Sequence, residues 1–461
     1  MEQREPQPTK TRHVVAMPYP GRGHINPMMN LCKLLLHRNP NLTVTFVVTE
    51  EWAGFIGSDP RPDSIRLATL PNVIPSELVR ADDFIGFVDA VFTKLEEPFE
   101  NLLDGLPGSP PPAAIIADTY VVWAVAVGRR RNIPVASLWT MSATILSLFL
   151  HSDDLARHGH FPVDPSGSKE DEIVDYIPGL PPTRLRDLPA IYHGYSHQVF
   201  NKAKRCFDEL FKANYLLFTS AYELEHKAVD FFTSKFHFPV YTIGPSIPFT
   251  ELSDSNDGNR GDHDYLRWLD QQPESSVLYI SQGSFLSVSK AQMDEIVAGV
   301  KDSGVRFIWV ARGGASVLKE ALGDCQGLVV SWCDQLRVLS HAAVGGFWSH
   351  CGFNSTLEGT YAGLPILAFP LFWDQILNGK MIVEDWRVGV RIKGKDEEDL
   401  IKRDDIEGIV KGFMDLENEE VKEMRRRARE LSEICRAAIA EGGSSDGNIN
   451  AFIRDIITKF P

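Results

Sequence analysis

The chain has 461 residues, more than one ordinary hydrophobic core holds, so we expect two or three domains. Hydrophobic residues make up 43% and charged residues 24% of the chain, which is the balance of a globular protein with a sizeable core. The formal net charge of -15 argues against a nucleic-acid partner, because an acidic surface repels phosphate backbones, but it is compatible with a local phosphate pocket built from backbone amides.

The N-terminus begins MEQREPQPTK and has no apolar core of the kind found in a secretory signal. No run along the chain approaches the ~18 apolar residues of a membrane span. We therefore expect a cytoplasmic protein without a membrane span. The six cysteines form no CxxC pair and match no zinc spacing, which favours reduced, mostly buried thiols.

The first half of the chain alternates short apolar runs with helical patterns. The runs expected to form strands are 13–17, 42–49, 113–117, 135–138 and 215–219. Helical patterns over 27–37 and 119–131 lie between them. Strands that alternate with helices predict a parallel sheet covered by helices on both faces.

The character of the sequence changes over 243–261, which is rich in Pro, Gly, Ser, Asn and Asp and reads as a linker. The alternation then restarts, with strands expected at 277–280, 307–310, 328–330, 344–348 and 366–369. We therefore predict an α/β protein of two Rossmann-like, doubly wound domains that face each other across a cleft. The expected divisions are 1–244, a linker over 245–262, 263–442, and a C-terminal helix within 443–461 that packs back on the first domain.

Two polar residues directly follow expected strands of the first domain, where ligands of such sheets bind. His24 lies in PYPGRGHINP after the first strand, and Asp118 follows the run 113–117. A buried carboxylate that binds an imidazole fixes its tautomer and stabilises the imidazolium, so the two could form a general base. The alternatives are a surface loop position for His24 and a helix cap for Asp118.

The stretch 332–375 carries polar and small residues that a plain βαβ unit does not need. Trp332 follows a strand and can offer its flat face to a heterocycle, or pack in the core. After the strand 344–348, His350-Cys-Gly-Phe-Asn-Ser-Thr opens a helix. Gly352 permits a tight turn, Asn354 and Ser355 are good N-cap residues, and the amides of a helix start suit a diphosphate.

Carboxylates later in the same stretch suit sugar hydroxyls. Glu358 follows Ser355 by three residues, on nearly the same helix face, and can accept both hydroxyls of a ribose. Asp374 and Gln375 stand side by side after the strand 366–369 and can grip vicinal hydroxyls. For Asp374 alone, a helix N-cap fits about as well.

Residues 332–375, WCDQLRVLSHAAVGGFWSHCGFNSTLEGTYAGLPILAFPLFWDQ, resemble the plant secondary product glycosyltransferase box. The length, the Trp at the start, the HCG-NS core and the terminal DQ all match. This box marks the plant UDP-dependent glycosyltransferases of the GT-B fold, and the resemblance extends from HVVAMPYPGRGHINP to EGGSS. It implies inverting transfer of a sugar from a UDP-sugar to a small acceptor. Enzymes of this family are mostly monomers, so the resemblance also implies a monomer.

The resemblance also implies roles for individual residues. His24 is the general base and Asp118 its supporter. The residues expected to bind the UDP-sugar are Ser284, Trp332, Cys333, Gln335, His350, Gly352, Phe353, Asn354, Ser355, Glu358, Asp374, Gln375 and Thr140. A terminal Gln usually accompanies UDP-glucose, so glucose is the expected sugar. Phe353 stands where the family usually has Trp, which removes an indole N–H, and Cys333 replaces the more usual Ala.

The acceptor is expected to be a small lipophilic hydroxyl compound, such as a phenolic, flavonoid, terpenoid or hormone. Its pocket should come from the first half, and the candidate lining residues, each of which also fits an ordinary core, are Phe84, Phe87, Tyr120, Met141 and Ile145. No cofactor or metal is expected. Asp262-His-Asp264 matches the DxD motif of metal-dependent glycosyltransferases, but it lies in the acidic linker rather than after a strand.

Two alternatives remain open from the sequence. The first is a UDP-sugar binder without catalysis, against which the presence of both His24 and Asp118 argues. The second is a nicotinamide-dependent oxidoreductase, suggested by Gly21-Arg-Gly23 after the first strand. The dinucleotide fingerprint requires a third glycine, and Asn26 occupies its place.

Overall fold

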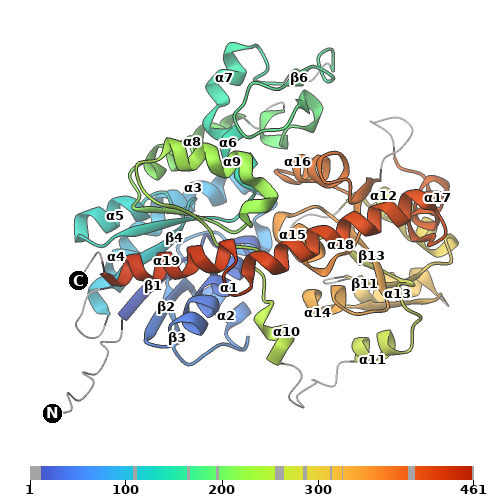
Figure 1. Cartoon of the computed structure of the whole chain (residues 1–461), viewed down its shortest axis with the longest axis horizontal. Coiled ribbons are helices and arrows are strands. Elements are labelled where there is room, and N and C mark those ends of the chain that lie inside the picture. The colour runs from blue at the N-terminus through green and yellow to red at the C-terminus, as the bar shows by residue number, and fades with distance from the viewer. Residues whose placement is uncertain are drawn as a thin grey trace.

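The computed structural model describes residues 12–106, 112–163, 167–193, 197–254, 264–283, 288–311, 314–323, 325–392 and 400–458. Two large parallel sheets lie in separate halves of the molecule, and helices cover both faces of each (Figure 1). The chain therefore has two doubly wound α/β domains, as the sequence predicts. Within the described ranges, no helix combines the length and apolarity needed to cross a bilayer.

The N-terminal sheet has seven parallel strands in the order β3-β2-β1-β4-β5-β8-β9. They are β1 (Arg12–Met17), β2 (Leu42–Thr49), β3 (Ile65–Leu70), β4 (Ala114–Asp118), β5 (Val135–Trp139), β8 (Tyr215–Phe218) and β9 (Val240–Thr242). Successive side chains of a strand pack into two hydrophobic cores on opposite faces of the sheet. Val14 and Ile116 pack on one face, and Val15 and Ile115 pack on the other. The strand order reverses between β1 and β4, and a crevice opens at such a point.

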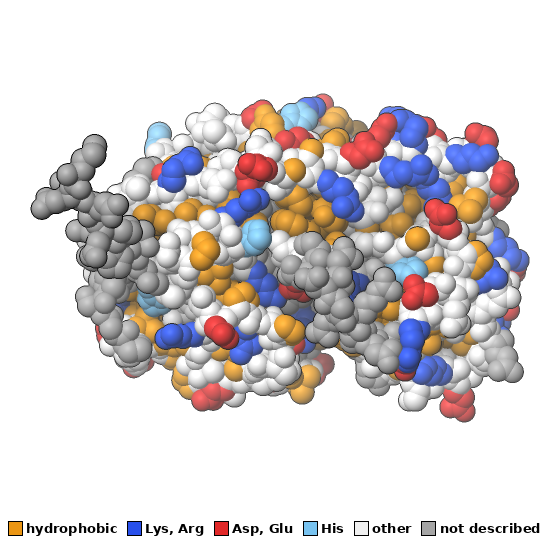
Figure 2. All heavy atoms as spheres, turned by 60° about the horizontal axis from the view of Figure 1, so that its bottom comes forward, with side chains coloured by type: hydrophobic (Ala, Val, Ile, Leu, Met, Phe, Trp, Pro, Cys, Tyr) orange, Lys and Arg blue, Asp and Glu red, His pale blue; other side chains and the backbone are white. Residues whose placement is uncertain are grey.

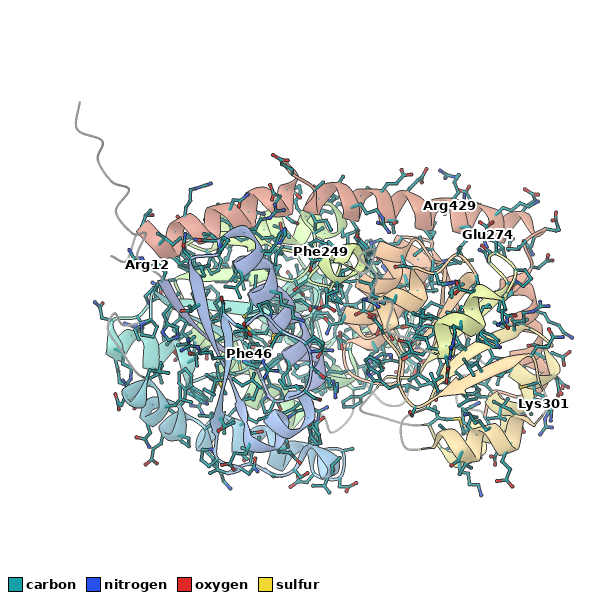
Figure 3. The ribbon with its side chains drawn as sticks, turned by 90° about the horizontal axis from the view of Figure 1, so that it is seen from below. Arg12, Phe46, Phe249, Glu274, Lys301 and Arg429 are labelled. Carbon is teal, nitrogen blue, oxygen red and sulfur yellow. The ribbon has the colours of Figure 1, made fainter. Side chains whose placement is uncertain are left out.

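Helices and a small hairpin surround this sheet. They are α1 (Arg22–Arg38), α2 (Glu50–Ile56), η1 (Glu77–Val79), α3 (Phe84–Lys94), α4 (Glu96–Gly105), α5 (Ala124–Arg131), α6 (Ala143–Leu150), α7 (Ser152–Arg157), β6 (Ile173–Val174), β7 (Thr183–Arg184), η2 (Leu185–Asp187), η3 (Ala190–Tyr192), α8 (His197–Leu210) and α9 (Tyr222–Lys235). Seen from below in Figure 3, Phe46 lies inside this half, and Phe249 lies where the two halves meet.

The C-terminal sheet has six parallel strands in the order β12-β11-β10-β13-β14-β15, with its reversal between β10 and β13. The strands are β10 (Val277–Ser281), β11 (Arg306–Val310), β12 (Gly327–Val330), β13 (Val344–Ser349), β14 (Ile366–Ala368) and β15 (Gly389–Arg391). The helices that precede or cover it are α10 (Thr250–Asp254), α11 (Asp264–Asp270), α12 (Lys290–Asp302), α13 (Ala315–Leu322), α14 (Gln335–Leu339), α15 (Phe353–Ala362), α16 (Gln375–Lys380), η5 (Met381–Asp385), α17 (Arg403–Met414) and α18 (Glu419–Ile439).

The last helix, α19 (Ser444–Thr458), belongs to the N-terminal half in space. In Figure 1 the two red helices α18 and α19 run one after the other across both halves. Phe452 of α19 packs edge-on against Tyr215, at 5.5 Å between ring centroids. Asn448 donates a hydrogen bond to the carbonyl of Thr242 at 3.0 Å. The chain thus crosses between the halves twice, which ties them together.

Several boundaries differ from the expected ones. Helix α1 begins at Arg22 rather than at 27, so His24 lies in its first turn and not in a loop. The predicted helix 119–131 begins only at Ala124, because turns occupy the residues after β4. Helix α19 begins at Ser444, inside the predicted range 443–461, and only residues 440–443 separate it from α18.

Candidate active site

A cleft with a volume of about 730 Å³ opens between the two halves. It lies at the carboxyl ends of β1, β4, β10 and β13, where the strand order of each sheet reverses, as expected for a ligand site of doubly wound sheets. The predicted site residues that line it are His24, Phe84, Tyr120, Thr140, Met141, Trp332, Cys333, Gln335, His350, Gly352, Phe353, Asn354, Ser355, Glu358, Asp374 and Gln375. Residues far apart in the chain thus meet in one cavity.

His24 and Asp118 form a hydrogen-bonded pair at the cleft wall. The Nδ1 atom of His24 lies 2.7 Å from Oδ2 of Asp118, and Thr140 Oγ1 lies 3.0 Å from the same nitrogen. The second carboxylate oxygen of Asp118 accepts the backbone N–H of Tyr120 at 2.9 Å. Because a carboxylate only accepts hydrogen bonds, Nδ1 carries the proton, and the lone pair of Nε2 can take up another.

The exposure of this pair fits a proton acceptor with a buried supporter. The side chain of His24 is 22% exposed, and that of Asp118 only 1%. The ring of His24 contacts two tyrosines, with centroid distances of 5.0 Å to Tyr19 and 6.1 Å to Tyr120. The histidine therefore faces the cleft in a fixed orientation, and the carboxylate lies behind it.

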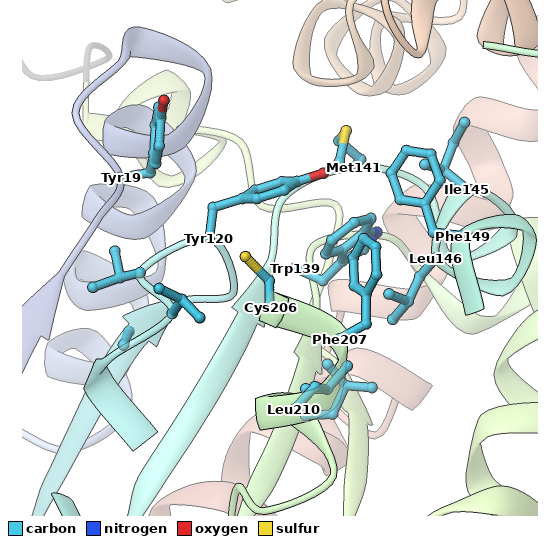
Figure 4. Close-up of a cluster of buried hydrophobic side chains, with 14 of the residues drawn as sticks. Tyr19, Tyr120, Trp139, Met141, Ile145, Leu146, Phe149, Cys206, Phe207 and Leu210 are labelled. Atoms are coloured by element: carbon cyan, nitrogen blue, oxygen red, sulfur yellow. The ribbon is translucent and has the colours of Figure 1, made fainter. Parts of the chain in front are cut away.

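The apolar part of the cleft lies next to His24. In Figure 4 the hydroxyl of Tyr120 points toward Met141, and both residues line the cleft. Phe87 and Ile145 do not line it: they are 1% and 0% exposed, and their side chains belong to the N-terminal core. Ile145 lies on α6, and every residue of this helix from Ala143 to Phe149 is buried.

An aromatic contact across the domain boundary closes the apolar part of the cleft. Phe84 of α3 packs edge-on against Phe372 and Trp373, at centroid distances of 6.2 and 5.6 Å. Trp373 adopts a left-handed backbone conformation with φ of 58°, which is uncommon for a bulky residue. Its carbonyl accepts the backbone N–H of Ala190 at 3.1 Å. In the sequence, Phe372 and Trp373 are recognisable only as two adjacent aromatic residues before Asp374.

Arg80 and Glu77 form a charged pair near His24 that was not predicted from the sequence. Arg80 lines the cleft, forms an ion pair with Glu77 at 3.1 Å, and donates to the carbonyl of Pro20 at 3.3 Å. Burial raises the pKa of Glu77 to about 7, although Arg80 opposes the shift. A side chain at Gly21 would come within 2.6 Å of the Arg80 guanidinium, so this glycine makes room for it.

On the opposite wall, Trp332 presents its ring to the cleft and is 55% exposed. Gln335 connects the polar groups beside it. Its Nε2 donates to Ser355 Oγ at 2.9 Å and to Glu358 Oε2 at 2.5 Å, and its Oε1 accepts the hydroxyl of Tyr279 at 3.0 Å. Burial raises the pKa of Glu358 to about 7, with the bond from Gln335 acting in the opposite direction.

The start of α15 differs from the predicted cap. Gly352 is the N-cap residue, and no side chain caps the helix, so neither Asn354 nor Ser355 serves as the cap. The first-turn amides are therefore not satisfied by a capping side chain at the cleft. His350 packs between Gly283 and Gly352: a Cβ on either glycine would come within 2.8 Å of its ring. Both glycines therefore leave the space that the imidazole occupies.

Asp374 and Gln375 lie at the start of α16. Gln375 Oε1 accepts the backbone N–H groups of Leu371 and Phe372 at 2.9 and 3.0 Å, which turns its NH₂ group toward other acceptors. Asp374 Oδ2 accepts a hydrogen bond from Asn378 at 2.7 Å rather than capping the helix. Burial raises the pKa of Asp374 to about 6, and the bond from Asn378 opposes this shift.

Comparison with known proteins identifies this arrangement. The model of the family described as UDP-glucoronosyl and UDP-glucosyl transferase matches residues 188–421, about half of the chain. UDP-glycosyltransferase 87A2 of Arabidopsis thaliana is 69% identical over 457 residues, which are 99% of each chain. UDP-glycosyltransferase 87A1 of the same plant is 71% identical over 441 residues, 95% of this chain and 99% of the relative.

The chain belongs to the plant UDP-dependent glycosyltransferases. The structure of Phytolacca americana UGT2 complexed with UDP-2fluoro-glucose and pterostilbene superposes with a TM-score of 0.80 at 26% identity, covering 97% of this chain and 100% of that one. Medicago truncatula UGT71G1 complexed with UDP-glucose gives 0.78 at 26% identity, covering 97% and 98%. This glycosyltransferase therefore has the GT-B fold, with its cleft between the two domains.

Two predicted features of this glycosyltransferase lie outside the described residues. One is Ser284, expected at the phosphates. The other is most of the DxD-like segment, of which the structure describes only Asp264, an exposed residue that begins α11. In the part of the chain that the structure describes, no three His, Cys, Asp or Glu side chains gather in a way that could hold a metal ion.

Proposed function

We propose that this glycosyltransferase transfers glucose from UDP-glucose to a hydroxyl of a small lipophilic acceptor, with inversion at the anomeric carbon and His24 as the general base. The observation that carries the proposal is the bond of 2.7 Å between His24 and the buried carboxylate of Asp118, in a cleft that also holds the donor box. In this proposal residues 1–244 supply the base and acceptor pocket, 263–442 hold the donor, 245–262 join them, and the helix in 443–461 packs back on the first domain.

The reaction is a single displacement. The acceptor oxygen attacks the anomeric carbon while its proton passes to Nε2 of His24, and the bond from that carbon to the phosphate oxygen breaks. The resulting imidazolium is stabilised by Asp118, whose other oxygen the amide of Tyr120 holds. UDP leaves with the electron pair. The uncapped amides at the start of α15, together with His350, support the developing negative charge.

The donor side of the proposal follows the positions of the polar groups. Trp332 stacks on the uracil ring, beside the backbone of Cys333, and Glu358 accepts the ribose hydroxyls while Gln335 holds it in place. Asn354 and Ser355 contact the diphosphate, and the family resemblance gives the same role to Ser284, which lies outside the described residues. Asp374 and the oriented NH₂ group of Gln375 bind the glucose, and Thr140 completes that contact from the opposite wall.

The acceptor side is apolar and lies beside His24. Phe84, Tyr120 and Met141 line it, with Phe372 and Trp373 closing it from the donor domain. A planar or compact lipophilic molecule fits these walls. The relative that binds pterostilbene, a phenolic, supports this class. In this proposal the enzyme acts as a monomer, which is supported by a cleft whose described lining residues come from both domains of one chain.

The test is a direct assay. Purified protein is incubated with UDP-glucose and a panel of phenols, flavonols and terpenoid alcohols, and the released UDP and the glucoside are quantified. We expect a β-glucoside, because inversion converts the α-linked donor. Full activity in His24→Ala, or no transfer from any UDP-sugar, would contradict the proposal. Binding of UDP-glucose without any turnover would instead indicate a UDP-sugar binder.

A further inference from the structure

Helix α1 contains a proline near its start, and this proline frees one backbone carbonyl beside the catalytic base. Pro27 lies inside the helix and has no N–H to donate. The carbonyl four residues earlier, that of Gly23, therefore lacks its helical partner. Gly23 directly precedes His24, so this carbonyl is part of the peptide unit that leads into the base.

A residue of the other domain supplies the missing partner. Asn354 Nδ2 donates to the carbonyl of Gly23 at 2.8 Å, although the two residues are 331 positions apart. Asn354 lies in the first turn of α15, in the C-terminal half, whereas Gly23 lies in the first turn of α1, in the N-terminal half (Figure 1). This hydrogen bond therefore crosses the cleft directly beside His24.

The chemistry of the side chain gives the bond a direction. A carbonyl only accepts, so the Asn354 atom that faces Gly23 is the nitrogen, which carries a second hydrogen for another acceptor. Its Oδ1 is buried and has no hydrogen-bond partner among the described residues. Burying an unpaired amide oxygen costs stability. The side chain is thus held where it bridges the domains, rather than where its own hydrogen bonds are best satisfied.

We propose that Asn354 is a positioning residue that ties the donor-binding helix start of α15 to the helix start that carries His24. The bond makes the distance between the base and the donor depend on the contact between α1 and α15. This inference rests on the proposed function of His24 as the base, and it goes beyond a contact of Asn354 with the donor phosphate. A misplacement of about 1 Å can cost up to about 100-fold in rate.

Three variants separate positioning from phosphate binding. Asn354→Ala removes the bridge together with any phosphate contact. Ser355→Ala is the matched control, since Ser355 neighbours Asn354 and bonds Gln335 instead of α1. Pro27→Ala leaves both donor residues intact but supplies an N–H that competes with Asn354 for the Gly23 carbonyl. The Pro27 carbonyl, which accepts the Ser246 hydroxyl at 2.9 Å, is retained in that variant.

The readout is kcat with two accepted phenols of similar size and different acidity, such as 4-nitrophenol and 4-ethylphenol, alongside UDP affinity by calorimetry. An ionised phenol needs no base, so a defect that acts through His24 shrinks with 4-nitrophenol. We expect Asn354→Ala to lower kcat at least tenfold with 4-ethylphenol and less with 4-nitrophenol. Pro27→Ala should do the same more weakly, with unchanged UDP affinity, and Ser355→Ala should raise only the donor KM.

Two outcomes for Asn354→Ala alone overturn the inference. One is an equal loss of kcat with both phenols in Asn354→Ala, and the other is a loss confined to donor KM and UDP affinity. Additive effects of Asn354→Ala and Pro27→Ala would also contradict it, because both variants disturb the same bond. A wild-type protein without transferase activity overturns the proposed function, and this inference with it, so the two failures are distinguishable.

Discussion

Nδ1 of His24 lies 2.7 Å from the carboxylate of Asp118. His24 lies in the first turn of α1, which follows β1, and Asp118 ends β4, the strand next to β1 where the order of the N-terminal sheet reverses. Parallel pairing of β1 with β4 brings their carboxyl ends to one edge of the sheet, so the start of α1 lies next to Asp118. The carboxylate is buried and the imidazole faces the cleft. This relationship predicts how the enzyme responds to loss of the carboxylate charge.

Replacing Asp118 with Asn should lower kcat by about 100- to 1,000-fold, because general-base catalysis contributes factors of this size. The amide is nearly isosteric, but its NH₂ group donates to Nδ1 and so places the imidazole proton on Nε2. That nitrogen can then no longer accept the acceptor proton. Steady-state kinetics would measure the change, and donor KM should stay close to the wild-type value. Retention of more than a tenth of kcat would argue against a role for Asp118.

Gly352 and His350 provide a prediction for the donor site. A Cβ at Gly352 would come within 2.5 Å of Nε2 of His350, so Gly352→Ala should displace the imidazole and weaken UDP binding about tenfold. The control is Gly408→Ala in α17, where an added Cβ meets nothing within 4 Å. The control should keep UDP affinity and gain a little stability, because alanine favours a helix. Calorimetric titration with UDP compares the two variants, and equal affinities would contradict the packing argument.

Much of the architecture follows from local sequence, and the exceptions have physical causes. Strands β1, β2, β4, β5 and β10 are buried on both faces and appear as plain apolar runs. Among the edge strands of the two large sheets, β12 was predicted from its apolar run, whereas β3, β9 and β15 were not. Arg, Thr or Gly interrupts the short apolar stretches of those three strands, so their own residues carry little of the strand signal.

The site residues also divide into those that local sequence predicts and those that depend on tertiary contacts. His24 and Asp118 were predictable, since Asp118 ends one recognisable strand and His24 lies in the segment that follows another. Phe84 and Trp373 meet only because two domains dock, and no spacing in the chain predicts a contact between them. Asn354 is a good capping residue by propensity, yet Gly352 caps α15 and Asn354 reaches across the cleft instead. Tertiary contacts decide these positions.

Asp187 joins the two domains through charge. Its carboxylate, which is buried, accepts from Arg391 of β15 at 2.8 Å, and neighbouring Arg184 pairs with Glu384 at 2.8 Å. Because hydrogen bonds to charged groups contribute more than neutral ones, Asp187→Asn should lower the free energy of unfolding by about 1–2 kcal/mol. The control is Asp171→Asn, whose exposed pair with Arg186 should contribute less than about 0.5 kcal/mol. Urea denaturation measures the free energy of unfolding of both variants. Equal losses in Asp187→Asn and Asp171→Asn would contradict this prediction.

Glu358 predicts a pH dependence of donor binding. Burial raises the pKa of Glu358 to about 7, so near neutral pH a large fraction of the free enzyme carries a protonated Glu358. Ribose hydroxyls donate to the carboxylate and so favour its charged form, which lowers the pKa in the complex. Binding therefore releases a proton near pH 7, and UDP affinity should fall as the pH drops below 7. Calorimetry in buffers of different ionisation enthalpy detects that proton.

The raised pKa of Glu358 also makes the stability of the protein depend on pH. A carboxyl whose pKa is raised by folding keeps its proton more tightly in the native state, so its burial is tolerated at low pH and destabilises the protein as the pH rises from about 4.5 to about 7. Glu358→Gln should therefore raise Tm at pH 8, leave it unchanged near pH 4, and weaken UDP binding without a pH dependence. Glu320→Gln on the exposed face of α13 should change neither quantity. If Glu358→Gln kept the pH dependence of UDP affinity, another group would have to carry the proton.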